Sequence, residues 1–185
     1  FNPLHDFDAK RFCVPGDLLF SLVLDKCGLS SHMTFTFSGM VNNTIALKFP
    51  ESINGTACVI DDNQKEYLNV SCSGDKTREH KPINVLTKAY VEFSGKTFPH
   101  ILVDLMAEND VMINRARPMV MYERMSIELQ HFDFDQLELA LTKSQLSVNG
   151  KRGTVQLKFD LLQNGRVIGQ GVKHMMLGGL KPYAA

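Results

Sequence analysis

The stretch Cys13-Val-Pro-Gly-Asp-Leu-Leu-Phe-Ser-Leu-Val-Leu-Asp25 decides how the rest of this chain is interpreted. Its apolar run fits two structures. It is either a strand that begins after a Pro-Gly turn, or a helix that begins after Pro15 and ends at Gly28. A second copy of the pattern elsewhere in the chain would decide between them.

The segment Asp135-Gln-Leu-Glu-Leu-Ala-Leu-Thr142 is the best counterpart of Asp17-Leu-Leu-Phe-Ser-Leu-Val-Leu24, at an offset of 118 residues (135 − 17). Met33–Phe37 similarly matches the region of Gly153–Leu157. Both copies follow a strand-turn-strand pattern. Because the later copy lies where apolar and polar residues alternate most regularly, the comparison predicts a strand over residues 17–24.

The second half of the chain favours a helix followed by an antiparallel sheet. Phe98-Pro99 precedes apolar residues at helical spacing, which predicts a helix over residues 100–113, although the β-branched residues there also allow a strand. After Pro118 the alternation predicts four long strands, at 119–129, 137–148, 154–162 and 167–177. Asn149-Gly150 and Asn164-Gly165 are strong hairpin turns. Further strands are predicted at 33–37, 45–49, 57–60, 67–71 and 85–93.

The segment from residue 50 to residue 84 is rich in Pro, Gly, Asn, Asp and Ser, which indicates a variable region. Ser73–Pro82 is its best linker candidate. The predicted organisation is therefore a partial or variable first β-rich repeat over residues 1–75. A unit with a helix and a four-stranded antiparallel sheet follows over residues 76–185.

The totals exclude some classes of function. The chain has 185 residues, 44% hydrophobic and 22% charged, and its formal net charge is zero. Such a neutral chain has no overall attraction for nucleic acid, so no nucleic-acid partner is predicted. No apolar run approaches the roughly 20 residues of a membrane-spanning helix, so no membrane span is predicted.

Three short motifs carry a family resemblance. Arg11-Phe-Cys-Val-Pro-Gly-Asp-Leu18 resembles the start of the third strand in hotdog-fold acyl-carrier dehydratases. Pro99-His-Ile-Leu-Val-Asp-Leu-Met-Ala-Glu108 is similar to the start of their central helix, and Asn164-Gly-Arg-Val-Ile168 to the turn before their last strand. The resemblance implies an α+β fold in which an antiparallel sheet wraps a central helix. The repeat would make it a double hotdog.

The resemblance also implies a site on the central helix, where an acidic residue does the chemistry. Asp104 is the matching carboxylate, and His100 and Glu108 lie four residues to either side on one helix face. Asn109 and Met106 are the expected binding residues. The implied function is acyl-thioester binding or processing, as in a thioesterase or dehydratase of fatty acid or polyketide metabolism. Acyl-CoA or acyl-carrier protein would be the partner, with no cofactor and no metal.

The cysteines and sequons support an alternative: a secreted or luminal all-β sandwich that binds a protein or lipid partner. Disulfides would join Cys13 to Cys27 and Cys58 to Cys72. The three N-glycosylation sequons begin at Asn42, Asn54 and Asn69.

A third interpretation is a catalytically silent hotdog domain of a larger synthase. The dehydratases carry a histidine just before the central helix, but Val91-Glu-Phe-Ser-Gly95 has none. The first predicted repeat also lacks a helix. Under this interpretation the chain serves packing, as a homo-oligomer or part of a larger chain. A hotdog enzyme would be cytoplasmic, whereas used sequons and disulfides would mean a secreted or luminal protein.

Overall fold

The computed structural model describes residues 13–114 and 118–183, so Arg11 and Phe12 of the first motif lie outside it. In that part of the chain, three α-helices, a π-helix and nine strands follow one another. Their bounds are α1 Gly16–Cys27, β1 Leu29–Phe37, β2 Gly55–Ile60, β3 Glu66–Thr77, α2 His80–Thr97, η2 Phe98–Leu102, α3 Val103–Glu108, β4 Val111–Met112, β5 Met119–Leu129, β6 Glu138–Asn149, β7 Arg152–Gln163, β8 Arg166–Gly178 and β9 Lys181–Pro182.

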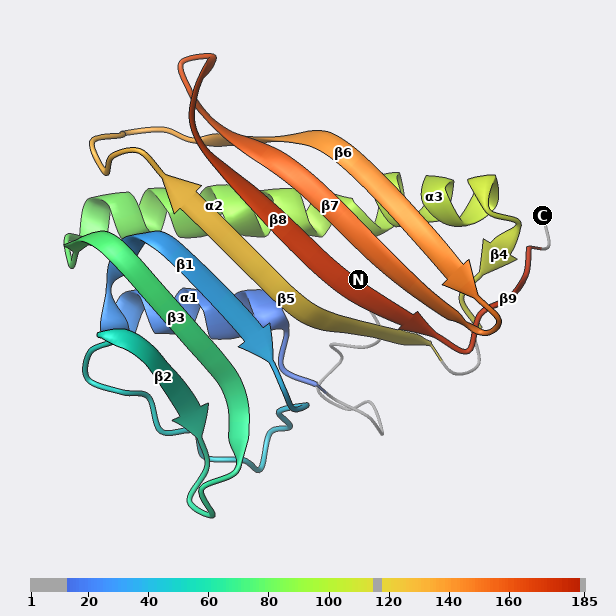
Figure 1. Cartoon of the computed structure of the whole chain (residues 1–185), viewed down its shortest axis with the longest axis horizontal. Helices are drawn as coiled ribbons and strands as arrows, with labels where there is room; N and C mark the ends of the chain where they lie inside the picture. The colour runs from blue at the N-terminus through green and yellow to red at the C-terminus, as the bar shows by residue number, and fades with distance from the viewer. Residues whose placement is uncertain (1–12, 115–117, 184–185) are drawn as a thin grey trace.

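Seven strands form one antiparallel sheet in the order β2-β3-β1-β5-β8-β7-β6, and β4 pairs separately with β9. Figure 1 shows this curved sheet with α1 and α2 side by side on one face, running in opposite directions. β1 and β5 pair in the middle of the sheet, with Thr34 opposite Ser126. Each of these two strands is preceded in the chain by a helix that covers the sheet.

The opening stretch is a helix, so the predicted strand over residues 17–24 is wrong. The buried residues of α1 are Leu19, Phe20, Val23 and Leu24, a spacing that places them on one helix face. Pro15 stands at its N-cap. Gly28, at φ +92°, ends it by donating its N–H to the Leu24 carbonyl. These end signals, and not the apolar run between them, distinguish the helix.

The strand predicted at 85–93 is wrong for the same reason, because these residues lie inside α2. Ile83, Leu86, Tyr90 and Phe93 are buried at intervals of three and four residues, which is the spacing of a helix face. The predicted linker at 73–82 is also wrong. Its first residues complete β3 and its last begin α2, and the boundary at 75/76 falls inside β3.

The predictions for the second half are largely confirmed. β5, β6, β7 and β8 match the four predicted strands within two residues at each end. Asn164 and Gly165 both have positive φ, 50° and 74°, as a type I′ hairpin turn requires. The helix predicted at 100–113 is present as η2 and α3, although it ends at Glu108. Residues 45–49 contribute only one bridge, from Lys48 to Ile60.

The fold is therefore α+β, and the alternative of an all-β sandwich is wrong. In the described residues, a single large sheet buries its inner face against helices instead of a second sheet. The larger core cluster joins α1, α2 and the inner faces of β1, β3 and β5, and a smaller one lies beneath α3. No helix in the described ranges is long and apolar enough to cross a membrane.

The predicted disulfides are not formed in the structure. Cys27 is the last residue of the 12-residue helix α1, which is about 18 Å long, and Cys13 precedes its first residue. Cys58 faces Asn69 across β2 and β3, whereas Cys72 faces Gly55. This offset of three residues is roughly 10 Å along the strands. Both separations exceed the roughly 7 Å between Cα atoms that a disulfide tolerates.

Candidate functional site

Four polar side chains from four elements meet where the N-terminus of α1 approaches the sheet. Asp17 lies in the first turn of α1, and Ser94 lies in the last turns of α2. Tyr122 comes from β5 and Lys173 from β8. Asp17, Ser94 and Tyr122 are half-buried, whereas Lys173 is fully buried. We call these four residues the polar cluster.

Hydrogen bonds connect the polar cluster. The Lys173 ammonium donates to Ser94 Oγ at 2.7 Å and to the Tyr122 hydroxyl. The Tyr122 hydroxyl donates to Asp17 Oδ1 at 2.8 Å and lies 2.6 Å from Ser94 Oγ. Lys173 Nζ lies 3.8 Å from Asp17 Oδ1, so the phenol stands between cation and carboxylate. The polar cluster is one connected network.

The charge of Lys173 is poorly stabilised by its surroundings. Burial lowers the pKa of Lys173 from 10.5 to about 8, and the Asp17 carboxylate only partly offsets this. Burial, with Asp17 next in importance, also raises the pKa of Tyr122 well above 10. Tyr122 is therefore a neutral phenol near pH 7, able to donate to Asp17.

Aromatic rings form the inner wall behind the polar cluster. Lys173 Nζ lies 5.4 Å from the centre of the Tyr90 ring, which packs at 4.6 Å on Phe20. Phe93 packs on Phe159 at a centroid distance of 4.9 Å. These rings exclude water from the inner side of Lys173, which accounts for the effect of burial on its pKa.

We expect the burial of Lys173 to make stability depend on pH. Its pKa is about 8 in the folded chain and 10.5 as the ordinary value. Between these values the unfolded chain binds more protons than the folded chain, so the free energy of unfolding rises with pH. The stability gained in this way is lost as pH falls through 8. In urea unfolding, the wild type should gain about 2 kcal/mol relative to Lys173→Met between about pH 7.5 and pH 9.5. If the free energy of unfolding changed equally with pH in the two proteins, Lys173 would not have a lowered pKa.

The polar cluster combines three chemical capabilities. The first N–H groups of a helix lack intrahelical partners. In α1 those of Leu18 and Leu19 donate to the Pro15 carbonyl. The N–H groups of Gly16 and Asp17 are therefore the ones that can stabilise an oxyanion. A carboxylate has about four acceptor positions, so Asp17 can hold a water molecule besides its bond from Tyr122. Ser94 supplies a hydroxyl next to an amine. This set suits attack on a carbonyl carbon.

The residues predicted from the sequence lie elsewhere. His100, Asp104 and Glu108 are exposed along η2 and α3, and exposed Asn109 bonds to the Leu105 carbonyl of its own helix. Met106 is buried in the core. Because α2, η2 and α3 are continuous, Asp104 lies near the end of a long helix and not at its start. It has no free backbone N–H groups beside it.

The sequence contained two signals for the polar cluster, and the first is the Val-Pro-Gly-Asp motif that ends at Asp17. Its strand assignment hid the position of Asp17 in the first turn of a helix. Lys173 was the stronger clue in hindsight: it occupies an inward position of β8, between Gly171 and Met175. A lysine at a core position of a strand is rare unless it has a partner.

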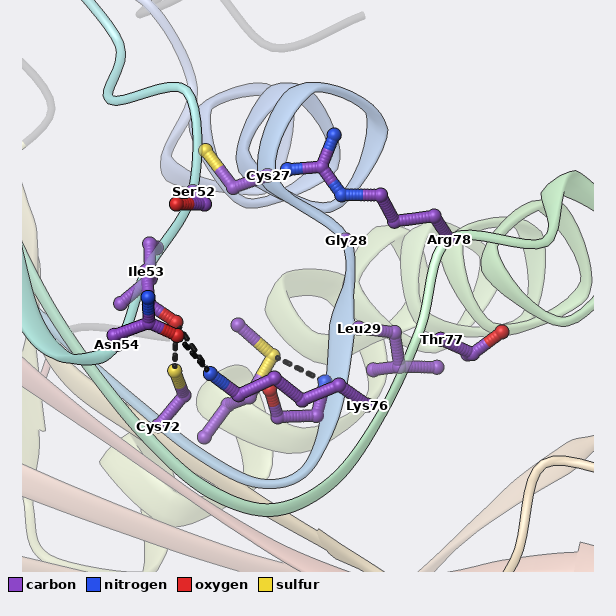
Figure 2. A pocket seen from close by; sticks show the side chains of 12 residues that line it. Cys27, Gly28, Leu29, Ser52, Ile53, Asn54, Cys72, Lys76, Thr77 and Arg78 are labelled. Carbon is purple, nitrogen blue, oxygen red and sulfur yellow. Dashed lines mark hydrogen bonds between the residues drawn. The ribbon is translucent and has the colours of Figure 1, made fainter.

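A second candidate site is a cavity of about 70 Å³ at the other end of α1, shown in Figure 2. The segment 50–54 closes it. Cys27 and Arg78 bond to the carbonyls of Pro50 and Glu51, and both Cys72 and Lys76 bond to that of Ile53. Small-molecule sites are typically about 300–1,000 Å³, so this cavity is too small for an acyl thioester.

A broader hollow of about 580 Å³ lies where β1, β3, β5 and β8 meet. Its lining includes His32, Asp75, Glu128 and Gln170, all of them exposed. It is large enough for a ligand, but these side chains make no hydrogen-bonded network like that of the polar cluster. In the described ranges, no three His, Cys, Asp or Glu side chains are arranged to hold a metal ion.

The sequons occupy different environments. Asn42 and Asn54 are exposed, and their modification remains a prediction. Asn69 is half-buried within β3, and its amide donates to Cys58 Sγ at 3.2 Å. A glycan on Asn69 would break that bond.

Comparison with known proteins supplies a family and a fold. A family model described as "Protein of unknown function (DUF3581)" matches residues 1–185. A search of curated proteins finds no match to the sequence.

Two solved structures resemble the chain over nearly its whole length. One is a protein provisionally described as a thioesterase II from Thermobifida fusca YX, with a TM-score of 0.51 and 10% identity; the match covers 90% of this chain and 87% of that one. The other is the acyl-CoA thioesterase II TesB2 from Mycobacterium marinum, with a TM-score of 0.50 and 8% identity, covering 92% and 91%. At these identities the likeness establishes the fold, which confirms the predicted hotdog-like architecture.

Proposed function

This chain belongs to the DUF3581 family, and from its hotdog-like fold and its polar cluster we propose that it hydrolyses acyl thioesters. The observation that carries the proposal is the position of Asp17. Its carboxylate lies in the first turn of α1, where it accepts a hydrogen bond from Tyr122 and lies 3.8 Å from Nζ of the buried Lys173. CoA or an acyl-carrier protein would carry the substrate.

The chemistry of thioester hydrolysis suits this arrangement. The carbonyl oxygen becomes negative as the carbon is attacked, and the first N–H groups of α1 are placed to stabilise that charge. Asp17 holds and activates the attacking water as a general base. Tyr122 donates to Asp17 and so fixes the orientation of the carboxylate. Asp17 thus takes the role that the sequence resemblance gave to Asp104.

We further propose that the fold is a double hotdog, with its two halves joined by the β1–β5 pair. The antiparallel pairing of His32–Thr36 with Arg124–Glu128 is what a junction between two such sheets requires. The polar cluster then uses both halves, because Asp17 comes from the first and Lys173 from the second. Neither half alone would carry the complete site.

The test is release of free thiol from a panel of acyl-CoA and acyl-carrier substrates, from acetyl to palmitoyl. We expect at least one substrate to be turned over with a kcat in the usual enzymatic range, above about 1 s⁻¹. Failure to hydrolyse any of them would contradict the proposal and favour the silent structural domain. If an acyl-CoA raised the melting temperature but was not hydrolysed, the chain would be a binding domain and not an enzyme.

A further inference from the structure

We propose that Ser94 is a nucleophile that carries the acyl group covalently, with Lys173 as its base. The inference rests on the proposed thioester hydrolysis and assigns it a two-step course. It differs from direct attack by water, which needs only Asp17 and the start of α1.

The contacts of Ser94 are those of an activated nucleophile. A serine hydroxyl is reactive only when a neighbouring base can take its proton. Ser94 Oγ lies 2.7 Å from Lys173 Nζ, and a third group, Tyr122, bonds to both. This third partner fixes the amine relative to the hydroxyl.

Ser94 is more exposed than the lysine that it contacts. Lys173 is 0% exposed, whereas Ser94 is half-buried, so a substrate would meet the hydroxyl first. The next residue, Gly95, is exposed, and an added Cβ there would meet no atom within 4 Å. The proposal therefore requires the acyl thioester to approach the polar cluster from the side of α2.

The environment of Lys173 increases the share of neutral amine, which is the form that a base must have. The groups that face it are Asp17 from α1, Tyr90 and Ser94 from α2, and Tyr122 from β5. Of these only Asp17 carries a carboxyl group, and its Oδ1 lies 3.8 Å from Lys173 Nζ, farther than the hydroxyl of Ser94. With a pKa of about 8, roughly a tenth of Lys173 is neutral at pH 7.

The proposed reaction is balanced without any co-reactant except water. Ser94 Oγ attacks the thioester carbonyl carbon, and its proton passes to the neutral amine of Lys173. The C–S bond then breaks, and the leaving thiolate takes the proton from the ammonium. In the second step, water held by Asp17 attacks the acyl-serine ester, and the ester C–O bond breaks. Asp17 takes the proton of the water, and the Ser94 alkoxide regains a proton from Asp17 through the Tyr122 hydroxyl as the carboxylic acid is released.

The experiment is acid quenching of the full-length chain during turnover of its best acyl-CoA, followed by mass spectrometry of the intact protein and its peptides. We expect an added acyl mass on the Ser94 peptide, with the greatest accumulation in Asp17→Asn, where the second step is slowed. Ser94→Ala should lose the adduct and at least 100-fold in kcat. Ser126→Ala, the same change at a half-buried serine on the outer face of β5, should keep both.

The dependence of kcat/KM on pH distinguishes a base from a purely structural residue, because a structural role for Lys173 would not affect it. If Lys173 is the base, kcat/KM should rise up to about pH 8 in the wild type. Lys173→Met should form no adduct, although it should fold. Two results would overturn the inference and leave the thioesterase proposal standing, provided that the wild type turns over its substrate. One is a Ser94→Ala variant with unimpaired kcat, and the other is an Asp17→Asn variant that forms no adduct. No turnover by the wild type would instead refute the proposed function.

Discussion

Asp17→Asn should lower kcat for thioester hydrolysis by at least 100-fold while leaving the fold intact. The amide keeps the shape of the side chain and can still accept the Tyr122 hydroxyl, but it cannot take a proton from water. General-base catalysis typically contributes about 10²–10⁴-fold to a rate. Steady-state kinetics with the best acyl-CoA would measure the loss, and circular dichroism would check the fold.

Asp104→Asn is the matched control, because it makes the same change at an exposed carboxylate that the sequence favoured. We expect its kcat to stay within about twofold of the wild type, since an exposed helix side chain away from the polar cluster holds no reacting water. The reverse result, with Asp104→Asn inactive and Asp17→Asn active, would move the site to α3 and remove the polar cluster from the mechanism.

Gly171→Ala should destabilise the chain by about 3 kcal/mol, at the upper end of what overpacking a core costs. Gly171 lies on the inner face of β8, and a Cβ there would stand 2.2 Å from Cζ of Phe159. That ring cannot move away easily, because it packs against Phe93 at 4.9 Å and Tyr90 at 6.4 Å. Urea denaturation at pH 7 would measure the loss.

The cause can be tested by shrinking the ring. Phe159→Leu removes the atoms that clash, so the double variant Gly171→Ala/Phe159→Leu should be more stable than Gly171→Ala alone. Gly95→Ala in α2 is the control, because a Cβ there meets no atom within 4 Å. It should stabilise the helix by about 0.5–1 kcal/mol. Strictly additive effects at residues 159 and 171 would contradict the proposed clash.

Periodicity predicted the second half of the fold well because its strands have one polar and one apolar face. Alternation is then unambiguous, as in β7, where Val155, Leu157 and Phe159 point inward. It failed for α1, whose seven-residue run Leu18–Leu24 is apolar at all positions but Ser21. Such a run fits a strand or a helix equally well, and the repeat at an offset of 118 residues then matched a helix to a strand.

The candidate site was harder to predict because its residues are distant in the sequence. Asp17 and Tyr122 are 105 residues apart, and Lys173 and Ser94 are 79 apart. A local motif could point to Asp17, but nothing near Ser94 or Tyr122 marks them as partners. The resemblance directed attention to an acidic residue on a central helix. That expectation fits α1 as well as α3, and only the fold distinguishes the two.

The distances along the chain also bear on how the protein folds. Contacts between residues far apart in sequence form slowly, because closing a long loop costs entropy before the contact is gained. The β7–β8 hairpin, with its two-residue turn, can form early, whereas the bond from Tyr122 to Asp17 must wait until β1 has joined β5. During refolding, recovery of catalytic activity should therefore lag behind recovery of helix and hairpin signals. The reactive serine and its base would stay apart until the chain had almost reached its native state.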